Sequence, residues 1–330
     1  MTEPQARTLA PLAAFDIAAD GSARALDEPW PMPAPGSGAT WRWLHCDRSS
    51  PAFADWVAEH LPAQVRGALL AAETRPRAEA VEGGLLLTLR GINFNPGAES
   101  EDMVAIRIWA TEGLVVTSRL RRIFAVDELR VQITSGAAPA TTGAFVARLA
   151  GMVTRKIEEV VAAREEATDE VEETLLDEVP DAVGTGERQI SQLSRSIIKL
   201  RRHIAPQREA LVALAAMGPP LIGKADRHEL REVANRGLRL VEEIDAARDR
   251  LASLRAHVDS LHAGQIGRQG FILSVVAAIF LPLGFLTGLF GVNVAGMPGT
   301  GTPWAFWALT GASVVLGLAL GLVFRWMRWF

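Results

Sequence analysis

The chain has 330 residues, and its 49% of hydrophobic and 22% of charged residues are typical of a folded protein rather than a disordered one. Its formal net charge of -4 and isoelectric point near 5.9 argue against nucleic acid as a partner. A single cysteine, Cys46, excludes an intrachain disulfide and is typical of a reducing compartment.

The N-terminal part of the chain predicts an irregular segment followed by an α/β domain. Residues 1–38 are rich in Ala, Pro and Gly and lack a long apolar run, so we expect irregular backbone and no signal peptide. Residues 39–140 alternate β-like runs, such as "TWRWLHC" and "GLLLTLRGI", with two short helical stretches. The runs "MVAIRIWA" and "LVVTSRL" are separated by "TEG", which predicts a hairpin.

Residues 141–225 predict two long helices of opposite charge. Eleven acids and one base lie between Glu158 and Asp181, whereas six bases lie between Arg188 and Arg208. An acidic helix followed by a basic one is typical of a charge-complementary antiparallel hairpin. Two solvated faces without a specific partner are the alternative interpretation.

A third helix is expected over residues 226–290, with two faces of different character. Bulky residues at helical spacing predict a packing seam, which comprises Leu240, Ile244, Ala247, Leu251, Leu254, Val258 and Leu261. Short side chains recur on roughly the opposite face in steps of three and four. This small-residue stripe comprises Asp249, Ser253, Ala256, Ser260, Ala263 and Gly267, and it continues through Gly270, Ser274, Ala277, Leu281, Gly284 and Gly288.

Two uncharged runs near the C-terminus predict membrane spans. No residue from Phe271 to Phe324 is charged, and the run from Phe271 to Phe290 would cover about 30 Å as a helix, which is the hydrocarbon thickness of a bilayer. The second span is expected over residues 304–324, after a loop over 291–303 that contains no Lys or Arg. The positive-inside rule therefore places the loop in the periplasm, and both termini, including the basic tail 325–330, in the cytoplasm.

The small-residue stripe has two interpretations. Close packing between membrane helices is one. A pore wall, with Leu281 as a hydrophobic constriction, is the other, and we favour it because the stripe extends well outside the predicted bilayer. Two helices per chain cannot enclose a pore, so a channel would require a cyclic homo-oligomer with the first span innermost.

The stretch "FLPLGFLTGLFGVNVAGMPG" resembles the two-transmembrane GxN superfamily of CorA magnesium-channel relatives. Their Gly-x-Asn tripeptide closes the first span and corresponds here to Gly291, Val292 and Asn293. The Val form, together with "TRPR" (74–77), "TLRGIN" (88–93) and "APQR" (205–208), is similar to the ZntB branch of zinc transporters. The resemblance covers nearly all of the chain after the first 40 residues.

The resemblance implies a funnel-shaped homopentamer in the bacterial inner membrane, with an α+β cytosolic domain, long helices and a two-helix membrane hairpin. It implies Zn2+ as the transported ion, with proton-coupled uptake favoured over efflux; a CorA-like channel for Mg2+, Co2+ or Ni2+ is the alternative. By position, Asn293 would form the outer polar ring and Gly291 the turn beneath it. Gly284 stands where relatives often place a hydroxyl, and "MPGTG" lacks the acid of many CorA-type loops.

The ligand chemistry of the predicted pore suits a hydrated cation. No Cys, His or carboxylate lies between Phe271 and Trp304, so Zn2+ would lack its preferred ligands there. The amide of Asn293, backbone carbonyls and the hydroxyls of Ser274 and Thr287 are the available oxygen ligands. We expect no tightly bound cofactor.

The titratable residues nearest to the spans are His257, Asp259 and His262. They are candidates for a metal or proton site, with solvated or packed histidines as the alternative. The run "LHCD" (44–47) contains soft ligands in His45, Cys46 and Asp47 but lies on a predicted strand, where neighbours face opposite ways. No enzymatic motif is present, so transport would use ion or proton gradients. A membrane-anchored scaffold or sensor is the alternative from another class.

Overall fold

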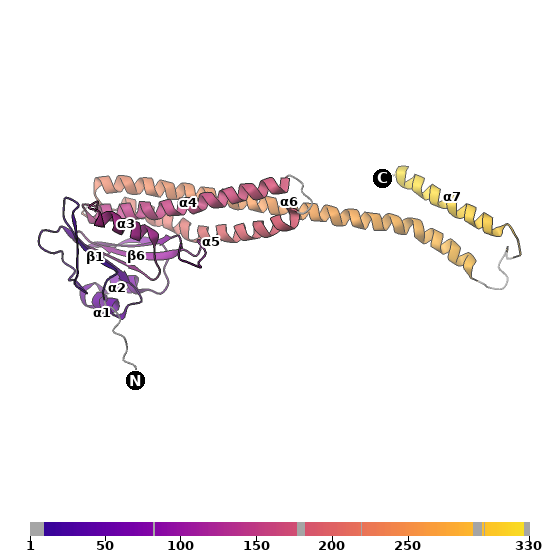
Figure 1. The fold of residues 1–330 in the computed structure, drawn as a ribbon. Coiled ribbons are helices and arrows are strands. Elements are labelled where there is room, and N and C mark those ends of the chain that lie inside the picture. The colour runs from indigo at the N-terminus through magenta and orange to yellow at the C-terminus, as the bar shows by residue number, and fades with distance from the viewer. Residues whose placement is uncertain are drawn as a thin grey trace, which may run out of the picture. The chain divides into compact units, whose positions relative to one another are not determined.

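The computed structural model describes residues 10–81, 83–176, 182–218, 220–292, 299 and 301–326. It divides into two compact units, Met1–Arg255 and Ala256–Phe330. The first unit contains a β-sheet and most of the helices, and the second contains the last part of a long helix and the final helix (Figure 1).

A mixed sheet of seven strands forms the centre of the first unit, in the order β2-β1-β3-β7-β6-β5-β4. Neighbours pair antiparallel except β3 and β7, which are parallel, with Leu44 opposite Val116. Parallel neighbours need a crossover, and the one between β3 and β7 contains two helices and three strands. The strands are β1 (Ala13–Ile17), β2 (Ala23–Ala25), β3 (Trp41–Asp47), β4 (Arg77–Val81), β5 (Gly84–Gly91), β6 (Val104–Ala110) and β7 (Leu114–Arg119).

One face of the sheet is covered by two short helices, α1 (Pro51–His60) and α2 (Ala63–Leu70). Alternate strand residues point to this face, and many are apolar, such as Leu44 and Trp109. The helices bury Phe53 and Val65 in the same cluster. Removing this apolar surface from water stabilises the layer.

The opposite face carries buried aromatic side chains and longer helices. Trp43 packs against Phe145 of α4 (Thr142–Leu176), with their ring centroids 5.1 Å apart. Its indole Nε1 donates a hydrogen bond to Thr117 Oγ1 at 2.9 Å, so the large side chain is buried without an unsatisfied donor. Helix α3 (Phe124–Thr134) lies against α4.

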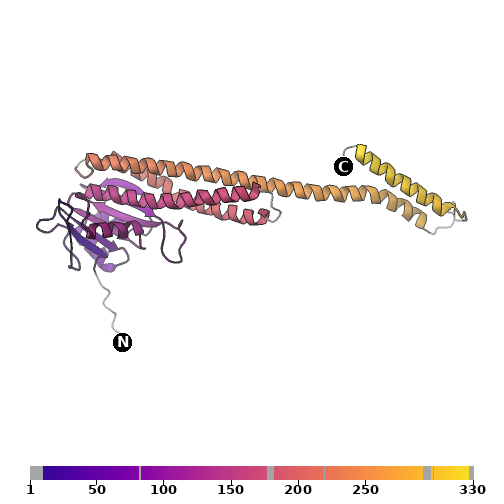
Figure 2. The same ribbon diagram turned by 45° about the horizontal axis from the view of Figure 1, so that its top comes forward.

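Three long helices lie side by side in the first unit: α4, α5 (Ala182–Ala216) and the first part of α6 (Lys224–Gly291) (Figures 1 and 2). Each contributes buried apolar side chains at helical spacing, for example Ile157 on α4, Leu200 on α5 and Ile244 on α6. Amphipathic faces of this kind stabilise helices that would be marginal in isolation.

The predicted charge pairing between the acidic and the basic helix is wrong. Within the described residues, no ion pair joins α4 to α5, although the two helices are in contact. The acids of α4 pair instead with α6: Glu158 with Arg236, and Asp169 with Arg250 at 2.6 Å. The sequence reveals the charge of each helix, but the third helix supplies the nearer partners.

The predicted irregular segment 1–38 is also corrected by the structure, because it contributes β1 and β2 to the sheet. A buried ion pair fixes it in place: Asp16 accepts hydrogen bonds from Arg42 Nε at 2.7 Å and from Arg42 Nη2 at 2.9 Å. Strand β4 and helix α3 are further elements that the sequence patterns did not indicate.

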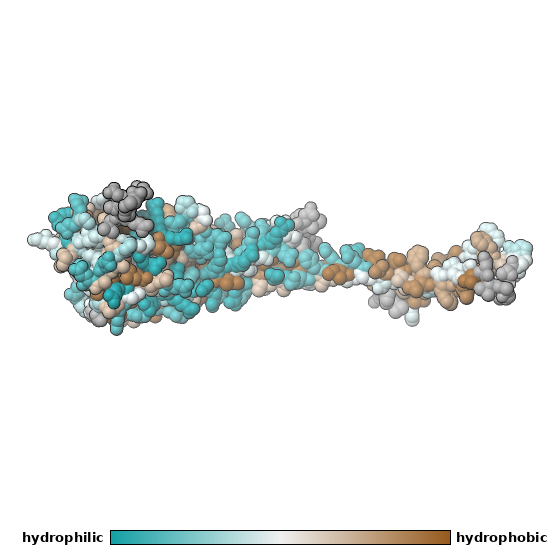
Figure 3. All heavy atoms as spheres, turned by 90° about the horizontal axis from the view of Figure 1, so that it is seen from below, coloured by the Kyte–Doolittle hydropathy of each residue, from teal (hydrophilic) through white to brown (hydrophobic). Residues whose placement is uncertain are grey.

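The second unit contains the predicted membrane segments. The apolar end of α6 and helix α7 (Ala305–Trp326) are long and apolar enough to cross a membrane. Figure 3 shows hydrophobic residues gathered over these segments, whereas the first unit is mostly hydrophilic on the same face. Helix α7 extends two residues beyond the expected end at 324, so Arg325 is helical rather than part of a tail; residues 327–330 lie outside the described residues.

Candidate functional site: the exposed stripe of α6

The two predicted faces of α6 differ in burial where the helix leaves the sheet domain. Six of the seven seam residues are buried, from Leu240 to Val258, whereas Leu261 is 39% exposed and ends the seam earlier than expected. The short side chains of the opposite stripe are exposed; these are Asp249, Ser253, Ala256, Ser260, Ala263 and Gly267. Along this stretch of α6, the bulky face is therefore packed and the small face is exposed.

Within the apolar segment, the small-residue stripe provides open space and hydroxyl oxygens. A Cβ added at Gly270, Gly284 or Gly288 would meet no atom within 4 Å outside the local helix. The Ser274 hydroxyl donates to the carbonyl of Gly270 at 2.9 Å, which leaves its oxygen lone pairs free to accept or coordinate. Ala277 is half-buried.

Solvent exposure does not distinguish the small-residue stripe from the other faces of this apolar segment. Leu281 is 71% exposed, but Leu273, which lies outside the stripe, is 72% exposed. The assignment of Leu281 as a constriction therefore stays a prediction, as does the pore role of the other stripe residues.

The Gly-x-Asn tripeptide lies at the end of α6. Gly291 is the last residue of the helix, and Val292 follows it with its side chain exposed. Asn293, the predicted polar ring, lies outside the described residues. Its role stays a prediction, although the helix ends where the tripeptide predicts.

The candidate metal residues on α6 do not form a site within one chain. His257 and Asp259 are exposed, and His262 is half-exposed. In the described part of the chain, no group of three or more His, Cys, Asp or Glu side chains is arranged to hold a metal ion. A site made from these three residues would therefore need side chains from more than one copy of the chain.

The pair His45 and Cys46 lies on β3, and its side chains point to opposite faces of the sheet. His45 Nδ1 is 2.8 Å from Thr117 Oγ1, whereas Cys46 lies in the cluster under α1 and α2. Burial lowers the pKa of His45 to about 3, with the Arg119 charge adding to the effect, and burial raises the pKa of the Cys46 thiol. A neutral imidazole and an inert thiol on opposite faces do not make a zinc site.

Three motifs behind the family resemblance meet at one residue, which their sequence positions do not reveal. Arg90 of "TLRGIN" donates from Nη2 to the carbonyl of Thr74 in "TRPR" at 2.8 Å. Its backbone N–H donates to Gln207 Oε1 of "APQR" at 2.6 Å. Helix α5 is thereby joined to β5, and the motifs have a structural role in the first unit.

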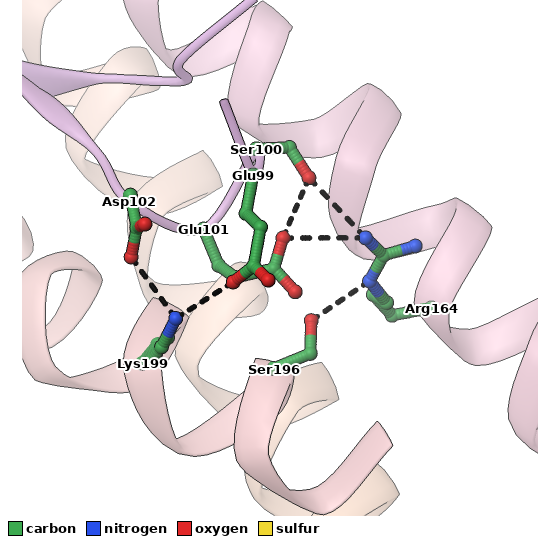
Figure 4. A network of polar contacts seen from close by, with 7 residues as sticks. All are labelled: Glu99, Ser100, Glu101, Asp102, Arg164, Ser196 and Lys199. Carbon is green, nitrogen blue, oxygen red and sulfur yellow. Dashed lines mark hydrogen bonds and ion pairs between the residues drawn. The ribbon is translucent and has the colours of Figure 1, made fainter. Parts of the chain in front are cut away.

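The loop between β5 and β6 is fastened to α4 and α5 by a polar network (Figure 4). Lys199 binds Glu99 at 2.8 Å and Asp102 at 3.0 Å. Arg164 lies 3.4 Å from Glu101 and donates to Ser196 Oγ at 2.8 Å. Burial raises the pKa of Glu101, but hydrogen bonds from Ser196 and Ser100 and the Arg164 charge outweigh it and lower the pKa to about 2. All three loop acids are thus engaged.

The fold defines a class: proteins in which a mixed-sheet domain is followed by long helices and two candidate membrane spans. Residues 38–326 match the family described as CorA-like Mg2+ transporter protein, and the chain belongs to this family. Because this is a family of transporters, the expectation that the chain is not an enzyme is confirmed.

Individual relatives agree with this assignment. The chain is 32% identical over 289 residues to the zinc transport protein ZntB of Yersinia enterocolitica, and 33% identical over 293 residues to the divalent cation transporter CmaX of Pseudomonas aeruginosa; each match covers 87% of both chains. The structure of full-length CmaX superposes with a TM-score of 0.84 at 29% identity, covering 99% of this chain and 100% of that one.

A more distant structure supports the fold alone. The CorA magnesium transporter from Methanocaldococcus jannaschii has a TM-score of 0.79 at 20% identity, covering 96% of this chain and 98% of that one. The expected CorA-like fold class and the resemblance to the ZntB branch are confirmed.

Proposed function

We propose that this protein transports divalent metal cations across the bacterial inner membrane, with Zn2+ as the principal ion. The observation that carries the proposal is the exposed small-residue stripe of α6 in a chain that is 32% identical to a zinc transport protein. The relative named a divalent cation transporter supports the broader class of ion.

The transporting form is a homopentamer in which α6 surrounds a central path. One chain has two candidate spans and cannot enclose a pore, so copies must combine. The stripe provides a face that can line a water-filled path, because short side chains leave room near the backbone. Helix α7 is assigned to the lipid-facing side, and both termini to the cytoplasm.

Selectivity is expected to act on a cation that keeps part of its water shell. The apolar segment of α6 contains no Cys, His or carboxylate, so the ion meets carbonyls, the hydroxyls of Ser274 and Thr287, and the amide of Asn293. Oxygen ligands of this kind bind a hydrated cation weakly enough to release it.

Uptake coupled to protons is the proposed direction and driving force. Neither candidate span contains a titratable acid or histidine, so protons would couple outside the spans, with His257, Asp259 and His262 as the nearest groups. Asp259 and His262 are three residues apart on a helix and can lie on the same side of it.

The test is cation flux into liposomes that contain the purified protein and an ion-sensitive dye. We expect Zn2+ entry that increases when the inside is made alkaline, because the proton gradient then favours uptake. Faster entry of Mg2+ than of Zn2+ would replace zinc by magnesium as the principal ion. No flux of any divalent cation at any pH gradient would instead favour a membrane-anchored scaffold or sensor.

The variant Asn293→Ala tests the polar ring. We expect flux to fall at least about tenfold, because a ring of oxygen ligands is lost at the entrance. Ser313→Ala on α7 is the matched control, since its hydroxyl only donates to its own helix at the carbonyl of Leu309. Unchanged flux in Asn293→Ala would remove this residue from the transport path.

A further inference from the structure

Three arginines gather on one face of the sheet, beyond the end of α2. Arg48 follows β3, Arg90 lies on β5 and Arg107 lies on β6. The register pairs Arg107 with Thr88, so Arg90 is its diagonal neighbour on the same face. Arg48 Nη1 and Arg107 Nη2 both donate to the carbonyl oxygen of Ala71, at 2.7 and 2.8 Å, which brings these two guanidinium groups together.

None of these arginines forms an ion pair in the described part of the chain. Their hydrogen bonds go to backbone carbonyls: those of Leu70 and Ala71 for Arg48, of Met103 and Thr74 for Arg90, and of Ala71 for Arg107. The Nε atom of each is buried without an acceptor, and Arg107 as a whole is only 3% exposed. Buried charges that lack a counter-ion are costly and therefore uncommon.

The three acids of the β5–β6 loop already have other partners, and the nearby Glu73 makes no ion pair with Arg90, although its charge opposes the lowering of the Arg90 pKa by burial. Glu99 and Asp102 also line this region, but both bind Lys199, and Glu101 is held by Arg164 (Figure 4). The loop that carries them thus forms a wall of the cavity while its negative charges are directed to α4 and α5.

The charges of the arginines act on one another and on a nearby histidine. Burial, together with the charges of Arg48 and Arg90, lowers the pKa of Arg107 to about 10. Burial likewise lowers the pKa of His203 to about 4, with Arg90 and Arg202 adding to the effect and Asp102 opposing it. The guanidinium groups remain charged at neutral pH, so their mutual repulsion persists until an anion enters.

The arginines line a cavity of about 610 Å³, together with Asn93, Arg121 and the loop residues from Gly97 to Glu99. This volume is in the range of small-molecule pockets. Within the described residues, neither Arg48 Nη2 nor Arg107 Nη1 has a protein acceptor, so both are available to a ligand.

We propose that this cavity binds a phosphate-bearing solute, with Arg48 and Arg107 as its main ligands and Arg90 as a supporting charge. Guanidinium groups match the oxygens of a phosphate in pairs, and several converging cations suit a multiply charged anion better than a halide. The site lies entirely in the first unit. It does not depend on the proposed ion or on the direction of transport.

The test uses the full-length protein in lipid-free detergent with pyrophosphate as the probe. Binding is measured by titration calorimetry, and the pyrophosphate-induced rise in Tm is measured in parallel. Relative to the unchanged protein, Arg107→Gln is expected to weaken binding at least about tenfold through the loss of a charge-assisted contact. Arg48→Lys retains the positive charge but not the paired N–H donors of the guanidinium group, so we expect it to weaken pyrophosphate binding less than Arg107→Gln does.

The matched control is Arg66→Gln, an exposed arginine on α2 outside the cavity, which should bind like the unchanged protein. If Arg107→Gln fails to fold, Arg48→Gln provides the same comparison. Equal affinities in the control and the cavity variants would overturn the proposal, as would the absence of pyrophosphate binding to the unchanged protein. In a separate titration with anionic lipid vesicles, binding to the vesicles without binding to pyrophosphate would also overturn the proposal, because the ligand would then be a lipid headgroup.

Discussion

The two units of this chain differ in where their polar side chains find hydrogen-bond or ion-pair partners and in how far their apolar side chains are buried. In the first, many charged residues find partners on other elements, as Arg236 does with Glu158, and large apolar residues are buried. In the second, the hydroxyls of Ser274, Thr287 and Thr310 donate to their own helix, while Leu273 and Trp307 are each 72% exposed. The first unit thus buries its large apolar side chains within the chain, whereas the second leaves many of them uncovered.

The largest effect should come from breaking the buried ion pair of the first unit. Asp16→Ala leaves Arg42 buried without its carboxylate and should lower the free energy of unfolding by about 3–5 kcal/mol. The measurement is denaturant unfolding followed by circular dichroism. Glu79→Ala removes the exposed partner of Arg77 and should change stability by less than about 1 kcal/mol. Equal effects of Asp16→Ala and Glu79→Ala would contradict the expected difference between a buried and an exposed ion pair.

The next largest effect contrasts one leucine from each part of α6. Leu251→Ala, in the buried seam, should lower the free energy of unfolding of the first unit by about 2–5 kcal/mol, because it leaves a cavity. Leu273→Ala, in the apolar segment, should leave that stability unchanged within about 0.5 kcal/mol. Thermal melts of both variants in the same detergent measure the two changes in stability. Similar losses of stability would contradict the distinction between a buried seam and an exposed apolar segment.

A smaller effect is expected from pH, through the buried His45. Its pKa is about 3 in the folded chain and about 6.5 when unfolded, so the unfolded state binds the proton first as the pH falls. Stability should therefore be retained above about pH 6.5 and decrease below it, by about 2 kcal/mol between pH 7 and pH 5. His45→Gln should make this decrease smaller. If the dependence of stability on pH were the same in the variant, His45 would not be the group responsible.

The smallest expected effect is a difference in thiol reactivity between single cysteines placed on the two faces of α6. Ser260→Cys or Ala256→Cys should react with water-soluble thiol reagents in the assembled protein, because the stripe is expected to line a wet path. Val258→Cys should stay protected, since Val258 is buried, and the native Cys46 is buried as well and adds little background. Protection at residues 256 and 260 would count against the funnel.

Much of the fold could be predicted because its signals are local. Short runs rich in apolar residues mark β3, β5, β6 and β7, and the spacing of Leu240, Ile244 and Leu251 marks the buried side of α6. These patterns depend on which side of an element meets water, and the sequence carries that information directly. Strands β1 and β2 carry no clear signal in the sequence because they are short and lie among Pro and Gly.

The amino-acid sequence is enough to locate the two environments of the chain, the candidate spans and the small-residue stripe, because hydrophobicity and periodicity are properties of neighbouring residues. Which charges meet depends on how the chain folds in three dimensions. The tertiary structure placed the acids of α4 against α6, brought Thr74, Arg90 and Gln207 into contact, and gathered Arg48, Arg90 and Arg107 around one cavity. Such groups join residues far apart in the chain, and the strand register and helix packing that unite them arise only when the whole domain folds.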